Sequence, residues 1–499
     1  MASLLSTLQH RLDDPSIPWK TVVAVSVLAG ELFEGYVGSR QRRFLDPILH
    51  PTLPASLKPY LAAEDAQTTY SKSQAYARHK MSFSSVVSAI GLVETVILLS
   101  NVSQPVLASL GFNVGTGSDW TLLKGFWTAA KYVPGVGGGA SSMGGPSEIR
   151  QTMGFIALST VASTILSIPQ DYYRNFVMEE KHGFNKMTRH TFVKDLVKGL
   201  LVSLLLEVPL LAGVVKIIHW AGQDAVLRIV SWTIGFVFLV QLAMIVVYPF
   251  VIAPLFNKFT PLAADSPFYP RIKAVAQRVG FPLDAVYVID GSTRSSHSNA
   301  YFVGVPGLPK QIVIFDTLLE KSTPEEVEAV LAHELGHWKG THIVYLLVTS
   351  LAQVAFSLSI FSLLLSNGPL LASFGFAPST ATTLAAKVAH PLSPAPVGPT
   401  VVALFLASTL FSPLSTFLKF CTNSVTRRLE YDADAFAAKL GGSYARNLKK
   451  ALVTIHEKNL AVYGVDHVYS ALNHNHPTLV ERLEALDAKL DKAGEKKLE

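Results

Sequence analysis

Long apolar runs constrain this sequence more than any other feature. Seven stretches carry about 20 mostly apolar residues each, the length that an α-helix needs to cross a bilayer. They are residues 20–38, 84–110, 150–170, 196–218, 226–256, 341–366 and 398–420. Only 16% of the 499 residues are charged, against about 25% in soluble proteins, and the mean hydropathy is +0.34. The sequence therefore predicts a mainly α-helical, polytopic membrane protein.

The first run is the weakest, since Glu31 and Glu34 interrupt its second half. A polar stretch precedes it and no small-residue cleavage site follows, so we expect a retained span rather than a cleaved signal. Later runs contain Glu94 and Glu207. Carboxylates within spans are expected to face an interior or a partner, and the alternative is a proton relay in a transporter.

Lysine and arginine alternate along the connecting segments. They are frequent in 39–83, 171–195 and 257–340, and scarce in 111–149, 219–225 and 367–397. Basic connecting segments tend to stay in the cytosol. We therefore expect a cytosolic C-terminus and a lumenal N-terminus, which an odd number of spans allows.

The runs divide the chain into four parts. These are 1–256 with five spans, 257–340, 341–420 with two spans, and 421–499, which is helical and charged. The Gly-rich stretch 133–147 indicates a flexible loop. The single cysteine, Cys421, excludes an intramolecular disulfide and a cysteine metal cluster.

The part from 257 to 340 has the features of a soluble segment. β-Branched residues predict strands at 286–290 and 311–315. Thr323 as N-cap, then Pro324 and two glutamates, predict the start of a helix.

That helix carries His333-Glu334-Leu335-Gly336-His337, a match to HExxH. Residues four apart share one face of a helix, so both imidazoles can bind one zinc ion, with Glu334 beside a water on the metal. Zinc lowers the pKa of such a water towards about 7. The alternative is an amphipathic helix that matches the motif by chance.

A catalytic zinc ion needs a third protein ligand. Residues 427–437 offer Glu430 and Asp434, again four apart. We expect Glu430 to bind zinc and Asp434 to accept the other ring N–H of a zinc histidine. The alternative is a solvated acidic face that pairs with Arg427 and Arg428.

Several blocks of the sequence resemble one known family. They are FEGYVGSRQ (33–41), FVMEEKHGFNK (176–186), RSSHSNAYFVG (294–304), IVIFDTLL (312–319), LAHELGHWK (331–339), LEYDADAFA (429–437) and NHNHPTLVERL (473–483). Together they resemble the type I CAAX prenyl proteases, the Ste24-type integral-membrane zinc metalloproteases. The resemblance implies seven transmembrane helices in a barrel around a water-filled chamber, closed on the cytosolic side by the zinc domain. It also implies one Zn²⁺ ion per chain.

The resemblance suggests further site residues. Asn299 would line the substrate groove, although an asparagine that satisfies its own turn is the alternative. His476 would stabilise the oxyanion, and Arg482 would bind substrate and orient the site. The sequence leaves open whether His474 or His476 faces the metal.

One strand and two further histidines remain to be interpreted. The strand 311–316 would pair at its edge with an extended peptide. We interpret His297 and His342 as ordinary polar residues.

The expected function is removal of the C-terminal aaX tripeptide from isoprenylated CaaX proteins, with a second upstream cleavage in a farnesylated precursor. The expected partners are those substrates and the lipid bilayer, without nucleic acid, and the expected state is a monomer. The expected location is the endoplasmic reticulum membrane, with the inner nuclear membrane as a second site. Lys496 and Lys497 near the end resemble a dilysine retrieval signal, the alternative being a merely charged tail.

Two other functions remain open at this stage. One is a membrane quality-control zinc protease that does not require a prenyl group. The other is a seven-helix transporter or receptor in which the motif is inert.

Overall fold

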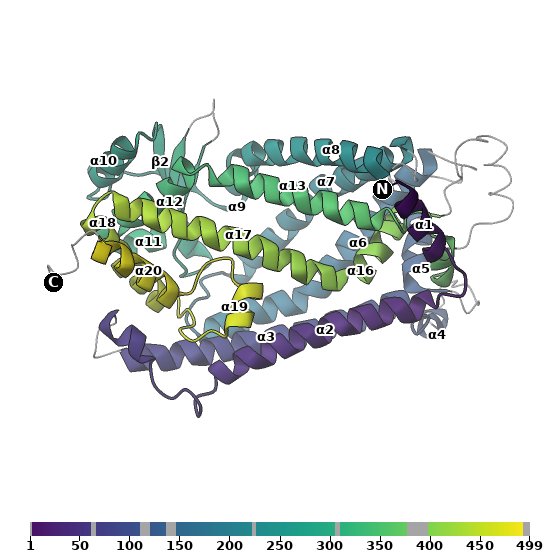
Figure 1. Ribbon diagram of the computed structural model, residues 1–499, viewed down its shortest axis with the longest axis horizontal. Coiled ribbons are helices and arrows are strands. Elements are labelled where there is room, and N and C mark those ends of the chain that lie inside the picture. The colour runs from purple at the N-terminus through teal and green to yellow at the C-terminus, as the bar shows by residue number, and fades with distance from the viewer. Residues whose placement is uncertain are drawn as a thin grey trace.

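The computed structural model describes residues 2–60, 66–109, 120–135, 146–221, 226–304, 310–376 and 398–492. The loops predicted at 133–147 and 367–397 lie mostly outside the described residues, and Lys496 and Lys497 lie wholly outside them. Figure 1 shows long helices that run along the molecule, with a small sheet and the C-terminal helices at one end.

The described residues contain six helical segments that are long and apolar enough to cross a membrane. They are α2 (Trp19–Phe44), α3 (Ala66–Leu99), α6 (Pro146–Tyr173) with a π-helical end (Arg174–Glu179), α7 (Arg189–Ala221), α8 (Val226–Val247) with a π-helical turn (Tyr248–Ile252) and α9 (Ala253–Phe256), and α13 (His342–Phe361). Short elements around them are α1 (Ala2–Leu12), α4 (Gln104–Ser109), α5 (Leu122–Ala129), α14 (Gly368–Ser373) and the 3₁₀ turns η1 (Ala55–Tyr60) and η2 (Ala130–Tyr132).

The seventh predicted span, 398–420, is not one straight helix. It is divided into α16 (Thr400–Leu410) and α17 (Ser412–Lys439), which meet at a bend of 70°. Pro413 is the second residue of α17, and proline removes a helical N–H and clashes with the carbonyl four residues earlier. Within the described residues, the number of candidate spans is seven when this bent pair counts as one.

The second predicted span is also misplaced. The run 84–110 predicts a helix there, whereas α3 begins at Ala66 and ends at Leu99. The apolar run corresponds only to the part of the helix that is expected to face lipid. The earlier turns are polar, and they bury Tyr70, Ser73 and Gln74 against other parts of the protein.

The spans are arranged as a closed ring, because contacts join each to the next. Each of the following hydrogen bonds joins two neighbouring spans: His79 with Tyr173 (α3–α6), Thr160 with Glu207 (α6–α7), Gln241 with Ser350 (α8–α13), Gln353 with the Leu418 carbonyl (α13–α17) and Thr416 with Glu34 (α17–α2). α7 packs on α8, and α2 on α3. Glu34 and Glu207 thus have partners on neighbouring helices, as expected for carboxylates in spans.

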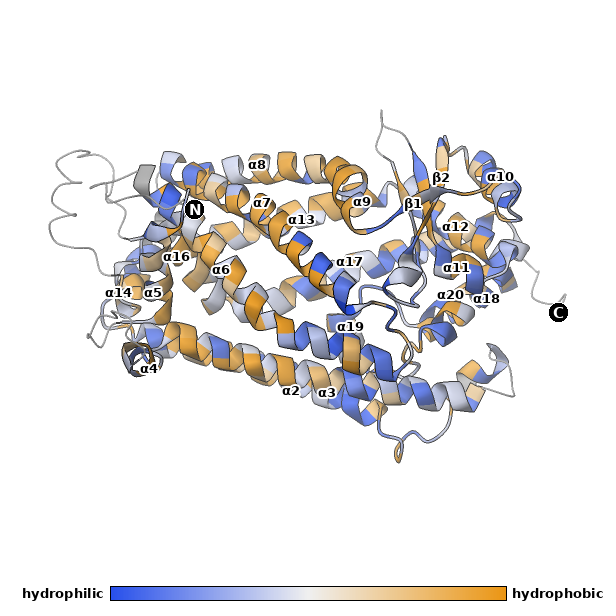
Figure 2. Cartoon of the chain, turned by 180° about the vertical axis from the view of Figure 1, so that it is seen from behind, coloured by the Kyte–Doolittle hydropathy of each residue, from blue (hydrophilic) through white to orange (hydrophobic). Residues whose placement is uncertain are grey.

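Many apolar side chains of the membrane helices are exposed, as lipid-facing residues should be. Leu32, Leu205 and Leu239 are each more than 60% exposed. Figure 2 shows apolar residues along α2, α7, α8 and α13, and polar residues around the sheet and α10, α18 and α20. A chain with this distribution is stable with the ring in lipid and the sheet end in water.

The sheet end is built from two segments distant in sequence. The first contains β1 (Phe259–Pro261), α10 (Tyr269–Val279), β2 (Ala285–Ile289), a 3₁₀ turn (Gly291–Thr293), β3 (Ala300–Val303), β4 (Gln311–Phe315), α11 (Asp316–Lys321) and α12 (Pro324–Lys339). The second contains the end of α17, α18 (Gly442–Lys458), α19 (His467–Asn473) and α20 (Leu479–Lys492). They share one hydrophobic core, in which Ile312 and Leu331 of the first segment meet Leu448 and Leu486 of the second.

The two strands predicted from sequence are confirmed, but the expected role of the second is wrong. The strand order is β1-β2-β4-β3, with β2 parallel to β4 and β3 antiparallel to it. β4 therefore has strands on both sides and cannot accept a peptide. The edge next to it belongs to β3, which packs on α12.

A close approach in the ring gives a stability prediction. A Cβ on Gly154 of α6 would lie inside contact distance of the Ala130 carbonyl oxygen and 3.2 Å from its carbon, whereas a Cβ on Gly91 of α3 meets nothing within 4 Å. Gly154→Ala should therefore cost about 1–3 kcal/mol through overpacking. Gly91→Ala should be neutral or stabilising by up to about 1 kcal/mol, since alanine favours helix. Thermal unfolding of the two variants in detergent tests this, and equal melting temperatures would contradict the packing.

Candidate metal centre

The helix that carries the HExxH motif begins at a capping box. Thr323 accepts a hydrogen bond from the Glu326 amide, and the Glu326 side chain accepts one from the Thr323 amide. Pro324 at the first position and the acidic first turn also favour this start. Leu331 and Leu335 are fully buried in the core. This packing fixes the rotation of α12 and hence the direction in which its two histidines point.

α12 and α17 approach very closely at Gly336. A Cβ there would lie 3.0 Å from Ala433 Cα and 3.1 Å from its carbonyl oxygen. Only glycine allows this separation without a shift of either backbone. The approach brings Glu430 and Asp434, which flank Ala433 on α17, against the two histidines of α12.

Three potential ligand atoms meet where the two helices touch. His333 Nε2 lies 3.2 Å from His337 Nε2 and 3.5 Å from Glu430 Oε2, and His337 Nε2 lies 3.3 Å from Glu430 Oε1. Ligands about 2.0–2.1 Å from a tetrahedral zinc ion lie about 3.3 Å apart. Glu430 Oε2 is buried and has no hydrogen-bond partner. The spacing, the orphaned oxygen and the two-histidine, one-carboxylate donor set all fit zinc.

Asp434 contacts the first histidine, His333, at the ring nitrogen that does not face the ligand cluster. Its Oδ1 lies 2.8 Å from His333 Nδ1, and its two oxygens accept hydrogen bonds from Arg482 Nε and Nη2 at 2.8 and 2.6 Å. This contact leaves His333 Nε2 free to bind a metal ion and fixes the ring orientation.

The electrostatic surroundings of His333 are unusual for a buried imidazole. Burial lowers the pKa of His333, but its interactions with Asp434 and Glu430 outweigh burial and raise it to about 9. Two buried carboxylates thus act on one ring, and a divalent cation would balance their negative charge.

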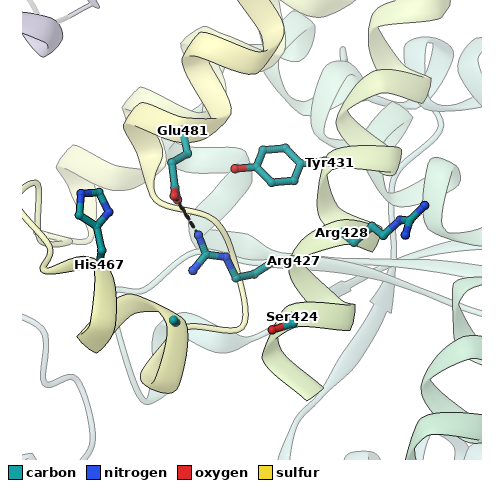
Figure 3. A pocket seen from close by; sticks show the side chains of 7 residues that line it. Ser424, Arg427, Arg428, Tyr431, His467 and Glu481 are labelled. Carbon is teal, nitrogen blue, oxygen red and sulfur yellow. Dashed lines mark hydrogen bonds and ion pairs between the residues drawn. The ribbon is translucent and has the colours of Figure 1, made fainter. Parts of the chain in front are cut away.

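The alternative of a solvated acidic face on α17 is wrong. Glu430 and Asp434 are 4% and 2% exposed. Arg427 pairs instead with Glu481, which accepts two hydrogen bonds of 2.9 Å (Figure 3). Within the described residues Arg428 has no ion pair.

The Arg427–Glu481 pair holds the turn that leads into α20. Glu481 also accepts hydrogen bonds from the amide and hydroxyl of Thr478. A cavity of about 460 Å³ lies beside the pair, between α17, α19 and α20 (Figure 3). The cavity does not include the three ligand atoms, so we interpret the pair as support for the turn that follows His476.

The structure distinguishes the two histidines before α20. His476 Nε2 lies 3.4 Å from Glu430 Oε1, and its side chain is 54% exposed. The ring of His474 contacts the edge of Tyr469 instead. Of the two, His476 is therefore placed to reach a group bound at the ligand cluster.

Glu334 is half-buried beside His333 and is not among the grouped ligand atoms. Burial raises the pKa of Glu334, which favours proton transfer at neutral pH over permanent ionisation. Glu334 thus lies next to the cluster without a share in it, and its separate role as proton acceptor stays a prediction.

The two residues expected to bind substrate lie in different surroundings. Asn299 is exposed at the start of β3, and its side-chain oxygen accepts a hydrogen bond from the Ala300 amide at 2.8 Å. That contact also fits the local-turn alternative. Arg482 is only 9% exposed and its guanidinium contacts Asp434. The structure thus places Arg482 behind the ligands rather than on a substrate surface.

The interpretation of His342 as an ordinary polar residue is wrong. It is 5% exposed, and its Nδ1 lies 2.8 Å from Nδ1 of His337. In the sequence His342 follows His337 by five residues and Gly340 by two, and this short spacing is a signal that could have indicated the contact. The contact depends on a turn between two helices, which helical periodicity does not reveal.

Comparisons with known proteins cover nearly the whole chain. Residues 48–258 match the family described as CAAX prenyl protease N-terminal, five membrane helices, and residues 269–490 match peptidase family M48. The chain is 35% identical to CAAX prenyl protease 1 of Saccharomyces cerevisiae, over 96% of this chain and 98% of the yeast protein. It is 32% identical to the CAAX prenyl protease 1 homolog of Homo sapiens, over 91% and 92%. The crystal structure of S. mikatae Ste24p superposes with a TM-score of 0.79 at 35% identity, covering 95% of this chain and all of that one.

Glu430 in the cluster and Glu334 beside it should respond differently to substitution. Glu430→Ala leaves two histidines, so the zinc content should fall along with peptide hydrolysis. Glu334→Gln keeps the shape and removes the proton acceptor, so zinc should remain near one ion per chain while hydrolysis falls by about 10²-fold or more. Zinc per mole and cleavage rate, measured on both variants, test this assignment. Loss of zinc from Glu334→Gln, or full activity of Glu430→Ala, would show that the roles are misassigned.

Proposed function

Because the chain belongs to the CAAX prenyl proteases of peptidase family M48, we propose that it is a zinc endopeptidase that removes the aaX tripeptide from isoprenylated CaaX proteins. The main support for this proposal is the cluster of His333, His337 and Glu430 beside Glu334. The cluster lies at the end of the ring of membrane helices that carries the sheet and the polar C-terminal helices. We also propose the second, upstream cleavage of a farnesylated precursor at the same site.

In the proposed reaction His333, His337 and Glu430 hold the zinc ion. Zinc bound in this way supplies Lewis acidity, which activates water and polarises a carbonyl. Glu334 accepts the proton of the attacking water and delivers it to the departing amine. His476 donates a hydrogen bond to the carbonyl oxygen as negative charge develops on it.

Two other residues act on the ligands rather than on the substrate. Asp434 holds the His333 ring, and Arg482 holds Asp434 through two hydrogen bonds. Because the Arg482 guanidinium is committed to Asp434, we propose for it a positioning role in place of substrate binding.

The edge of β3 is the proposed docking site of the peptide. Its partner β4 occupies one side, and within the described residues no strand pairs with the other. An extended peptide added there gains main-chain hydrogen bonds next to α12, on which β3 packs. Asn299 lies at the start of this strand, where its side-chain nitrogen would meet the peptide backbone.

The membrane setting explains why a lipid-modified chain suits this site. The prenyl group partitions into the bilayer or into an apolar surface within the ring, while the peptide bond must reach water and charged ligands. The ring of spans closes within a single chain, which supports action as a monomer.

A prenyl group on the substrate should therefore raise the rate of cleavage. A farnesylated CaaX peptide should be cut at least about tenfold faster than the same peptide without the lipid, since burial of each CH₂ contributes about 0.8 kcal/mol. The measurement is kcat/KM for the matched pair, with and without a chelator. Equal values for the two peptides would favour a quality-control protease of the same metal class, and chelator-resistant cleavage would contradict the metal site.

Contacts between the basic segments support the orientation that we propose in the membrane. Arg40 pairs with Asp466 beside α19, Arg294 pairs with Asp195, and Asn185 forms a bridge with Ser295. Segments 39–83, 171–195 and 257–340 therefore meet the C-terminal helices at one end of the molecule, and the N-terminal helix α1 lies at the other (Figure 1). We propose that the basic end, with the protease domain and the C-terminus, faces the cytosol.

We propose the endoplasmic reticulum membrane as the location, with the inner nuclear membrane as a continuous second site. Lys496 and Lys497 are the proposed retrieval signal. Replacing both by serine should move a fluorescently tagged protein from a reticular pattern to later compartments. An unchanged pattern would show that the two lysines are not a retrieval signal, and it would not affect the proposed orientation.

A further inference from the structure

A tight turn joins the zinc helix to the next membrane helix. α12 ends at Lys339, Gly340 follows, and Thr341 adopts a left-handed conformation with φ of 52°. α13 then begins at His342. This conformation is uncommon for a residue other than glycine or asparagine, and it separates the two helices within two residues. The first side chain of α13 is thereby turned back towards the last turn of α12.

The side chain turned back in this way reaches a proposed zinc ligand. Nδ1 of His342 lies 2.8 Å from Nδ1 of His337, with the rings nearly perpendicular at a centroid separation of 4.9 Å. His337 uses its other nitrogen, Nε2, towards His333 and Glu430. A histidine that binds metal through Nε2 carries its proton on Nδ1. His337 therefore donates this hydrogen bond, and His342 accepts it as a neutral imidazole protonated on Nε2.

The absence of a side chain at position 340 makes room for the His342 ring. A Cβ built on Gly340 would lie 2.6 Å from His342 Cδ2 and even closer to its Nε2. His342 is 5% exposed, so little space is available for its ring to move. Gly340 on one side and His337 on the other thus fix the position of the ring.

The geometry points to His342 as a positioning residue for the metal site. By accepting the Nδ1–H of His337, it sets the tautomer and rotation that present Nε2 to zinc. It also ties the first turn of membrane helix α13 directly to a ligand. This inference rests on the proposed zinc site and assigns a role to a residue outside the ligand set and the HExxH motif.

The charge balance of the site explains why an imidazole serves here. His333 already has an anionic acceptor in Asp434, and Glu430 adds a second buried carboxylate. Arg482 compensates one of these charges. A carboxylate behind His337 would add a third buried negative charge, which is costly without a partner. A neutral acceptor orients the ligand without that cost.

Two substitutions of nearly equal shape separate the hydrogen bond from simple packing. Asparagine at 342 can place its side-chain oxygen near the position of Nδ1, whereas leucine fills similar space without an acceptor. Loss of a hydrogen bond to a metal-binding side chain typically weakens metal binding by about 10- to 100-fold. His342→Leu should therefore bind zinc at least about tenfold more weakly than the unaltered protein. His342→Asn should retain most of the affinity.

The measurement is the zinc Kd of the full-length protein in detergent, by competition with a chromophoric chelator, together with the melting temperature of the metal-free form. Gly340→Ala should weaken zinc binding like His342→Leu, because it displaces the ring. Lys339→Ala, an exposed change in the same turn, is the control and should leave the Kd unaltered. A purely structural role would lower the melting temperature of both 342 variants and leave the zinc Kd unchanged.

Equal zinc affinity of His342→Leu and His342→Asn would overturn the inference, whatever their melting temperatures. A failure of the proposed metal site is distinguishable from this result, because the unaltered protein would then bind no zinc in the same assay.

Discussion

The close contact between α12 and α17 at Gly336 and Ala433 is the interaction on which the rest of the site depends. The ligands come from segments almost one hundred residues apart, separated by a membrane helix and a bent one. A Cβ on Gly336 would lie only 3.0 Å from Ala433 Cα, so the two backbones leave no freedom in the relative height or rotation of the helices. The positions of Glu430 and Asp434 relative to both histidines follow from that contact. A larger residue at 336 would separate the helices and change all the ligand distances together.

The polar groups around this contact are buried, so each needs a partner. Arg482 satisfies Asp434, Asp434 satisfies His333, and His342 satisfies His337. Arg427 and Glu481 hold the turn that brings His476 to Glu430. One carboxylate oxygen, Glu430 Oε2, has no hydrogen bond within this network. This unpaired oxygen lies 3.5 Å from His333 Nε2, and a cation bound between the ligand atoms would give it a partner.

Much of this could be predicted from the sequence, because the relevant signals are local. Bilayer thickness sets the length of the apolar runs, Thr323 and Pro324 mark the start of α12, and spacing of four places two side chains on one face. What the sequence did not reveal depends on tertiary structure. The central position of β4 follows from how strands assemble, and the contact of His342 with His337 follows from a turn between two helices. The bend before α17 is an exception, because Pro413 inside the apolar run is a local signal that could have predicted it. The early start of α3 was missed because its first turns pack on protein rather than lipid.

We propose that His333, His337 and Glu430 together bind one zinc ion between a soluble helix and a membrane helix. Anomalous diffraction from crystals of the protein, recorded on both sides of the zinc absorption edge, tests it most directly. We expect one anomalous peak per chain, about 2.0–2.2 Å from both histidine Nε2 atoms and a Glu430 oxygen. A peak at another group of side chains, or a site occupied without Glu430, would contradict it.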